Sequence, residues 1–236
     1  MRLDKFLSSM GIASRSEVSA AARRGAITVD GVVCRDASTH IDPDRSAVVF
    51  CGRSVTYKKY RYIMLNKPEG YVSATEDGKD PTVLDLLPEE YKKFNLFPCG
   101  RLDKNTLGLM LITDNGELSH RLLSPKRHVK KTYVYRSKFP ITDEEKELLE
   151  SGVTLDDGYE TKPSVIELDS GRDSGKITLT EGKYHQIKRM FESVNNKIIY
   201  LERVTFGPLV LDASLGRGEW RELNENEIKA LEEHAK

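Results

Sequence analysis

The sequence predicts an α+β fold, in which a small N-terminal domain precedes a larger domain with a central mixed or antiparallel sheet flanked by helices. Its 236 residues are long for one ordinary domain. Short apolar segments typical of strands are interleaved with capped helices. The chain also lacks the glycine-rich phosphate loop that many doubly wound sheets carry. We expect a first domain of residues 1–58 and a second of residues 59–236.

The first sixty residues predict two short helices followed by strands. Apolar residues at helical spacing over residues 3–7 predict the first helix, and a glycine ends it. Residues 14–17, Ser-Arg-Ser-Glu, form a capping box that opens the second helix. Residues 27–33 alternate about an Asp-Gly pair, which predicts a hairpin. The polar, basic residues 53–61 have little periodicity and are predicted to be a linker.

The rest of the chain predicts short strands around a few helices. Strand character is found at residues 62–65, 107–113, 131–139, 153–169, 176–180, 198–204 and 208–211. Helices are expected at residues 83–91, from Thr142, at residues 184–193 and from Asn224. In the third of these helices, Ile187, Met190, Phe191 and Val194 fall on one face, so this helix is expected to pack against the sheet.

Composition indicates a soluble cytosolic protein with an unevenly distributed charge. The chain has 38% hydrophobic and 31% charged residues, a formal net charge of zero and no long apolar run. Three scattered cysteines form neither a disulfide framework nor a metal motif. Residues 1–60 carry ten Lys or Arg against six Asp or Glu, and residues 121–138 carry seven cations and no acid. Such local positive surfaces favour a nucleic-acid partner.

Residues 100–109, GRLDKNTLGL, place Asp103 in a turn between glycines, directly before an apolar strand. Taken alone, this pattern favours an aspartate that holds a turn through hydrogen bonds to the backbone. The motif resembles the catalytic-aspartate motif of the RNA pseudouridine synthases, which convert uridine to its carbon-linked isomer. Residues 66–73, NKPEGYVS, also resemble the opening motif of that family.

Two later motifs resemble the same family in the expected order. Residues 131–135, KTYVY, resemble its K-x-Y motif, which implies that Tyr133 stacks on the target uracil. Period two puts Tyr135 on the same face, so spacing alone does not rank the two tyrosines. Residues 181–191, EGKYHQIKRMF, resemble the motif whose first basic residue pairs with the catalytic aspartate, which implies that Lys188 is the partner of Asp103.

The resemblance also implies which residues hold RNA. Residues 2–34 resemble the S4 RNA-binding module, whose two helices would present Arg2, Lys5, Arg15, Arg23 and Arg24. In the larger domain, Arg101 is expected to contact the extruded nucleotide, and Gln186 and Arg189 are assigned to RNA contact. For His185 we expect a structural or RNA-contacting role.

The order of domains and the segment KYHQIKRMF resemble the RsuA branch, which modifies one uridine of bacterial 16S ribosomal RNA. The sequence therefore predicts an isomerase without cofactor or metal, working as a cytoplasmic monomer on ribosomal RNA. Two alternatives remain open, an enzyme of the same branch acting on 23S RNA and a non-catalytic S4-type RNA-binding or ribosome-assembly factor. A glycosidase with paired carboxylates is disfavoured because no second acid lies near the motif.

Overall fold

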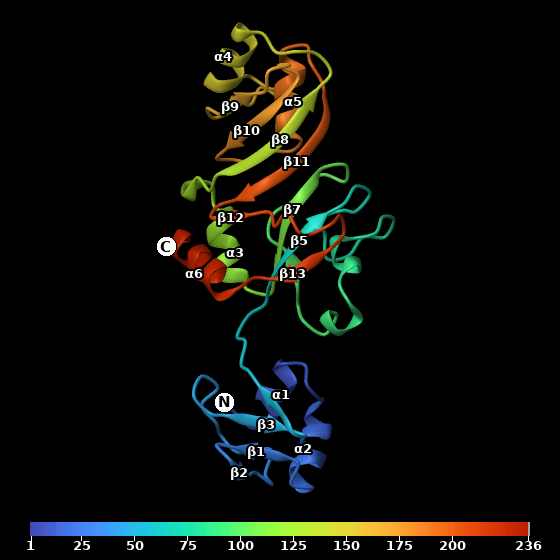
Figure 1. The fold of residues 1–236 in the computed structure, drawn as a ribbon, viewed down its shortest axis with the longest axis vertical. Coiled ribbons are helices and arrows are strands. Elements are labelled where there is room, and N and C mark those ends of the chain that lie inside the picture. Colours follow the sequence, from blue (N-terminus) through green and yellow to red (C-terminus); the bar gives the residue numbers. More distant parts are fainter. Residues whose placement is uncertain (236) are drawn as a thin grey trace. The chain divides into compact units, whose positions relative to one another are not determined.

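The computed structural model describes residues 1–235 and divides into two compact units. The smaller unit comprises Met1–Tyr60 together with Glu89–Phe94, and the larger comprises Arg61–Pro88 and the chain from Asn95 onward. Within residues 1–235, no helix is both long enough and apolar enough to cross a bilayer. The structure is of the mixed helix and strand class that the sequence predicts (Figure 1).

The smaller unit packs two helices against a four-stranded antiparallel sheet. The helices are α1 (Leu3–Ser9) and α2 (Arg15–Arg23). The sheet has the order β2-β1-β3-β4, formed by β1 (Ile27–Val29), β2 (Val32–Val33), β3 (Val48–Phe50) and β4 (Arg53–Val55). Because β4 lies within residues 53–61, the prediction that this whole segment is a linker is wrong. The short strand was missed because only one of its three side chains is partly buried, so it has no apolar alternation.

Local sequence explains how the helices of this unit begin and pack. The Ser14 hydroxyl accepts from the Glu17 amide, and the Glu17 carboxylate accepts from the Ser14 amide at 2.7 Å, so the predicted capping box is confirmed. The apolar faces of both helices meet in one core. Its buried members are Leu3, Phe6, Leu7, Val18, Ala21, Ala22, Ile27, Ala37, Ile41 and Val48.

The larger unit is built on a mixed sheet with the strand order β13-β5-β7-β11-β8-β10-β9. The strands are β5 (Tyr62–Lys67), β6 (Phe97–Pro98), β7 (Leu107–Thr113), β8 (Lys131–Ser137), β9 (Val165–Leu168), β10 (Ser174–Leu179), β11 (Ile198–Phe206), β12 (Leu209–Val210) and β13 (Trp220–Glu222). Among the pairings between named strands in the described part of this unit, only β7–β11 is parallel. This pair joins the two halves of the sheet.

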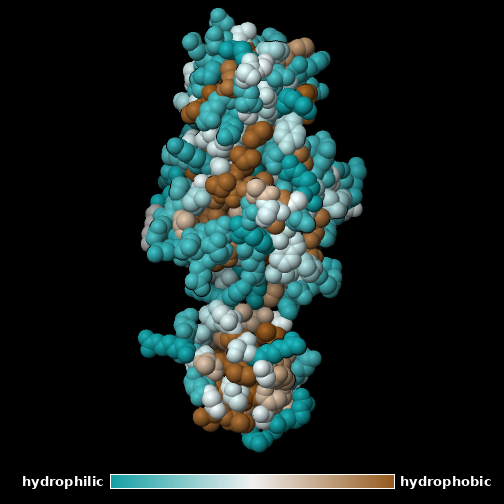
Figure 2. All heavy atoms as spheres, viewed as in Figure 1, coloured by the Kyte–Doolittle hydropathy of each residue, from teal (hydrophilic) through white to brown (hydrophobic). Residues whose placement is uncertain are grey.

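Helices flank both halves of the sheet. They are α3 (Gly116–Leu123), α4 (Asp143–Ser151), α5 (Gln186–Ser193) and α6 (Glu225–His234), with 3₁₀ turns η1 (Val83–Leu86) and η3 (Pro125–Arg127). A third 3₁₀ turn, η2 (Glu89–Tyr91), belongs to the smaller unit. In Figure 1, α4 and α5 accompany the half that contains β8, β9 and β10, whereas α3 and α6 accompany the half that contains β5 and β7. Figure 2 shows apolar side chains gathered over β11 and β12, within a surface that is mainly hydrophilic.

Three sequence predictions for the chain after residue 61 need correction. Residues 83–91 form two 3₁₀ turns rather than one helix. Within residues 153–169, only Val165–Leu168 is a strand, since residues 154 and 160 form an isolated bridge. The helix α3 was not predicted, although the Asn115 side chain caps it at 3.0 Å and its apolar face is buried. These differences arise in short segments, where packing overrides local preference.

The predicted motif turn lies where β7 approaches β11. Gly108 has φ of +96°, and a Cβ there would lie 2.3 Å from the carbonyl oxygen of Arg203. The second glycine of the motif is therefore required both by backbone conformation and by close strand packing. This approach brings β11 directly beside the loop that carries Asp103.

Candidate active site

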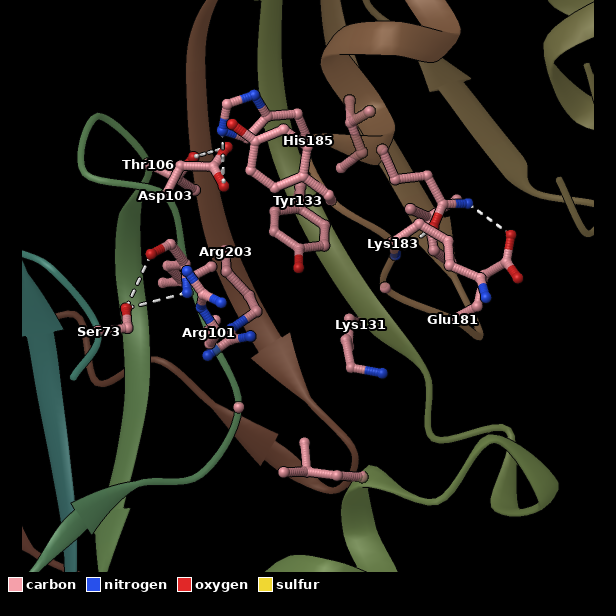
Figure 3. A pocket seen from close by; sticks show the side chains of 18 of the residues that line it. Ser73, Arg101, Asp103, Thr106, Lys131, Tyr133, Glu181, Lys183, His185 and Arg203 are labelled. Carbon is pink, nitrogen blue, oxygen red and sulfur yellow. Dashed lines mark hydrogen bonds and ion pairs between the residues drawn. The ribbon is translucent and has the colours of Figure 1, made fainter. Parts of the chain in front are cut away.

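A cavity of about 1000 Å³ opens in the larger unit, and residues from all three motif regions line it. Its lining includes seven Lys or Arg residues but only three Asp or Glu residues. Figure 3 shows Asp103 from the loop before β7, Tyr133 from β8 and Arg203 from β11 around this cavity. Strands from both halves of the sheet thus contribute to one basic pocket.

The backbone around Asp103 is held by the buried ammonium group of Lys67 at the end of β5. Lys67 is fully buried, and its Nζ donates to the carbonyl oxygens of Asp103 and Lys104 at 3.1 Å and of Thr106 at 2.9 Å. It also donates to the carbonyl of Pro68 at 3.1 Å. Desolvation by burial lowers the pKa of Lys67 to about 8, against the opposing effect of the Asp103 charge. One side chain therefore gathers the carbonyls of the aspartate loop.

The loop is also fixed from its other side. Ser73 Oγ donates to the Leu102 carbonyl at 2.8 Å and accepts from the Leu102 amide at 3.0 Å. Ser73 closes the segment that the sequence matched to the opening motif of the synthase family. Through Ser73, that motif therefore fixes the backbone of the loop that carries Asp103.

The Asp103 carboxylate faces two basic side chains from the start of α5. Lys188 Nζ lies 3.0 Å from Oδ2. His185 Nε2 lies 3.5 Å from Oδ1 (Figure 3). The Thr106 hydroxyl lies 3.5 Å from Oδ2. The Asp103 side chain is 27% exposed, so its carboxylate is paired with a cation and still reachable from the pocket.

His185 begins α5 in a left-handed backbone conformation, with φ of +49° and ψ of +31°. Histidine adopts this conformation more readily than bulkier residues, although a cost remains. Its ring stacks on Tyr184, with ring centroids 3.8 Å apart and an interplanar angle of 19°. Tyr184 is 71% exposed. The turn therefore presents an aromatic surface at the pocket, next to the imidazole that reaches Asp103.

The structure separates two tyrosines that sequence spacing could not rank. Tyr133 lines the pocket and is 9% exposed. Tyr135 is completely buried, and its ring meets that of Phe191 edge-on with centroids 5.0 Å apart. Burial raises the pKa of Tyr135, and its hydroxyl has no hydrogen-bond partner among the described residues. Of these two tyrosines, only Tyr133 is therefore available to a substrate.

Gln186 lines the pocket, but its side-chain amide is hydrogen-bonded within the protein. Its side chain is 4% exposed, and Nε2 donates to Glu181 at 2.6 Å while Oε1 accepts from the Lys183 amide at 2.9 Å. Glu181 also accepts from Tyr159 at 2.7 Å. The Gln186 amide therefore holds the turn before α5, and its RNA contact stays a prediction.

Arg189 is likewise bound within the protein. Its guanidinium group pairs with Asp156, and it lies 2.8 Å from Asp157. The Arg189 side chain is 12% exposed. Hydrogen bonds from Arg189 hold the pKa of Asp157 below its usual range. Two carboxylates therefore pair with this arginine, and its RNA contact stays a prediction.

The remaining predicted RNA-contacting residues are exposed. Arg101 lines the pocket and lies two residues before Asp103. In the smaller unit, Arg2, Lys5, Arg15, Arg23 and Arg24 are exposed, although Arg2 pairs with Asp4 at 2.7 Å. A small hollow in that unit is lined by Arg2, Arg23 and Arg35. Arg35 was not selected from the sequence, because it follows the hairpin rather than lying on either helix.

Among the pocket cations that were not selected as site residues, Lys131 and Arg203 lie on strands of the sheet. Arg203 on β11 is 1% exposed, and its Nε donates to the Leu109 carbonyl at 2.8 Å. Lys131 on β8 donates to the Val129 carbonyl at 3.0 Å. Lys131 belongs to the predicted K-x-Y motif, whereas Arg203 lies in a segment that reads simply as an apolar strand. A sequence pattern does not reveal that such an arginine faces a cavity.

No obvious metal site accompanies this constellation. Within residues 1–235, no group of three or more His, Cys, Asp and Glu side chains is placed to hold a metal ion. The pocket offers one carboxylate, two neighbouring basic groups and a tyrosine, which suit proton transfer, charge stabilisation and binding of a planar base.

Comparison with known proteins agrees with this architecture. Residues 61–193 match the family described as RNA pseudouridylate synthase, and residues 1–45 match the S4 domain. The chain is 48% identical to RNA pseudouridine synthase YtzG of Bacillus subtilis over 99% of both chains. It is 40% identical to ribosomal small subunit pseudouridine synthase A of Escherichia coli, over 98% of this chain and all of that protein.

A solved structure is similar over the same length. A crystal structure of a pseudouridylate synthase matches with a TM-score of 0.69 and 35% identity, covering 98% of this chain and 99% of that one. The chain therefore belongs to the RNA pseudouridine synthase family and carries an S4 domain at its N-terminus. It is an enzyme of the RsuA type, which isomerises uridine in RNA.

Proposed function

We propose that this enzyme converts one uridine of bacterial 16S ribosomal RNA to pseudouridine, with Asp103 as the catalytic group. The ion pair between Asp103 and Lys188, in a pocket rich in cations, is the observation that carries this proposal. The full-length similarity to an enzyme named for the small ribosomal subunit supports the 16S assignment. We further propose that the enzyme acts in the cytoplasm as a monomer.

The chemistry requires one bond to break and another to form. The bond between N1 of uracil and C1′ of ribose breaks, the base turns within the pocket, and C5 joins C1′. The hydrogen on C5 leaves to solvent, and N1 acquires a proton, so no net oxidation occurs. Asp103 acts either on C1′ directly, as glycosidic carboxylates do, or by promoting departure of uracil. The Lys188 ammonium group stabilises the carboxylate beside it.

The other pocket residues are assigned to holding the base. Tyr133 stacks on uracil while the base turns, because its ring borders the cavity and its hydroxyl adds a polar group there. Arg101 contacts the extruded nucleotide and helps offset the few kcal/mol that unstacking costs. Together these contacts keep the freed uracil from diffusing away.

The S4 domain is assigned to binding a nearby part of the RNA. Its exposed cations are suited to phosphate groups, which dominate protein–RNA affinity and make it salt-dependent. Residues assigned to this surface are Arg2, Lys5, Arg15, Arg23 and Arg24.

Tritium release from uridine labelled at C5 tests this assignment. Fragments of 16S and 23S RNA are incubated with the native enzyme and with Asp103→Asn, with and without ribosomal proteins. Release from 16S RNA alone, lost in Asp103→Asn, is expected. Equal release by the two proteins would refute the role of Asp103, and release from 23S RNA would refute the choice of subunit. Mapping of pseudouridine in both ribosomal RNAs of a deletion strain provides an independent check.

A further inference from the structure

Two cations on adjacent strands of the pocket have no acidic partner. Neither Arg203 nor Lys131 forms an ion pair with any carboxylate of residues 1–235. Arg203 is 1% exposed, and of its guanidinium nitrogens Nε alone donates to a backbone carbonyl. Nη2 lies 4.0 Å from the Met110 sulfur, a weak acceptor, and Lys131 makes one hydrogen bond to a carbonyl.

Both cations lie near the ring of Phe206. Lys131 Nζ is 5.8 Å and Arg203 Cζ is 5.1 Å from the centre of that ring. The Arg203 charge contributes to lowering the pKa of Lys131, after the larger effect of burial. Like charges that are partly or fully buried oppose folding unless a counter-charge is supplied. The carboxylate whose charge acts on Lys131 is that of Glu181, and its oxygens accept hydrogen bonds from Tyr159 and Gln186.

The location of the pair suggests what supplies this counter-charge. Both residues line the cavity that contains Asp103, and in Figure 3 the Tyr133 hydroxyl points toward the part of the pocket where Lys131 and Arg203 lie. The cavity is at the upper end of the range of roughly 300–1,000 Å³ that ligands of drug size occupy. A nucleoside bound at Asp103 therefore leaves room for an anionic group toward the two cations.

We infer that Lys131 and Arg203 form an anion site that binds a backbone phosphate of the extruded uridine nucleotide. This inference rests on the proposed function, because it gives the substrate of the same pocket a second point of attachment. Phosphate is the anion that an RNA nucleotide carries, and a planar guanidinium group beside an ammonium group is well matched to its oxygens. The site orients the ribose toward Asp103 while the uracil is free to turn.

The anion site is tested first on the native full-length enzyme without RNA. The titration of Lys131 is followed by NMR of its labelled Cε, alone and with inorganic phosphate, uridine or uridine 5′-monophosphate. A bound phosphate adds a negative charge, so the pKa of Lys131 is expected to rise above about 8 with phosphate and the monophosphate. Uridine is expected to leave it unchanged. An unchanged titration curve at saturating monophosphate would overturn the inference, whatever RNA the enzyme modifies.

A second measurement places the phosphate in the RNA. Lys131→Met is introduced into an Asp103→Asn background, and binding is measured to the ribosomal RNA fragment that the native enzyme modifies. Neutral methylphosphonate linkages are placed either 5′ or 3′ to the target uridine. Lys131→Met is expected to weaken binding of natural RNA about tenfold or more and to reduce the salt slope by about 0.7.

The control and the neutral linkages separate the possible outcomes. Lys229→Met removes an exposed lysine on α6, outside the pocket lining, and is expected to bind like the parent. When the neutral linkage replaces the phosphate that Lys131 contacts, Lys131→Met is expected to cause no further loss of affinity. The position of that linkage identifies the contacted phosphate. Equal losses by Lys131→Met on natural RNA and on both neutral-linkage RNAs would overturn the anion site while leaving the proposed function intact. Conversely, a raised Lys131 pKa without modification of 16S RNA would retain the site and refute the function.

Discussion

Lys188 Nζ lies 3.0 Å from Oδ2 of Asp103, so a cation from α5 neutralises a carboxylate carried by the loop before β7. The two residues belong to motifs that are far apart in sequence. Their meeting depends on the pairing of β7 with β11 and on the packing of α5 near β11. This relationship is the basis of the proposed catalytic role and gives the first prediction.

Lys188→Met is expected to lower kcat by about a hundredfold or more, because loss of a partly buried electrostatic partner at a reacting carboxylate has effects of that size. Lys188→Arg is expected to retain much more activity, since it restores the charge at the cost of altered geometry. Single-turnover rates on the RNA fragment, with urea unfolding to verify the fold, measure both. Equal rates for Lys188→Met and the native enzyme would show that the ion pair does not serve the reaction.

Tyr184→Ala is expected to raise KM for RNA about tenfold, because the exposed ring offers a stacking surface worth about 1–3 kcal/mol to a base. Tyr184→Phe retains the ring and serves as the matched control, so its KM is expected to stay near the native value. Since Tyr184 is 71% exposed, the free energy of unfolding is expected to change little in either variant. A similar KM for the alanine and phenylalanine variants would exclude stacking.

Tyr135→Phe is expected to leave the protein as stable as before, or to stabilise it by about 1 kcal/mol. The buried Tyr135 hydroxyl has no partner among residues 1–235, and an unsatisfied polar group is costly in a protein interior. Urea denaturation measures the change. Marked destabilisation would mean that the hydroxyl is satisfied, for example by a buried water.

Lys131→Met is expected to raise the free energy of unfolding near neutral pH by about 1–3 kcal/mol, because methionine retains the apolar stem without the buried charge. Burial lowers the pKa of Lys131 to about 8, whereas lysine in an unfolded chain titrates near 10.4. Between these values the unfolded chain binds more protons than the folded enzyme. The destabilisation that Lys131 causes in the folded enzyme therefore decreases as pH rises.

The advantage of Lys131→Met over the native enzyme should therefore be greatest below pH 8 and should shrink toward pH 10.4. Urea unfolding of both proteins at a series of pH values, in phosphate-free buffer, measures this difference. A constant difference across that range would show that Lys131 titrates normally in the folded protein. Lys229→Met, which removes an exposed lysine, provides the baseline.

Gly108→Ala is expected to prevent correct folding or to destabilise the enzyme by several kcal/mol, because the new Cβ meets the Arg203 backbone in a conformation that favours glycine. Gly78→Ala is a suitable control, since open space surrounds that position. Solubility and thermal unfolding of the two variants provide the comparison. A stable Gly108→Ala protein would contradict the close approach of β7 and β11.

The sequence by itself determined the features that depend on neighbouring residues. The capping box at Ser14, the helix starts at Thr142 and Asn224, and the apolar face of α5 follow from local hydrogen bonding and helical spacing, and each is found in the structure. Local pattern failed where segments are short or lack periodicity, as in β4 and η1.

Only the tertiary structure decided which polar groups meet. Tyr133 and Tyr135 are equivalent by strand period, yet one borders the pocket and the other packs beneath α5. Gln186 and Arg189 belong to a basic motif, but neighbouring acids bind both. The physical reason is that burial and electrostatic partnership are properties of the assembled sheet and helices, since charges interact through space rather than along the chain.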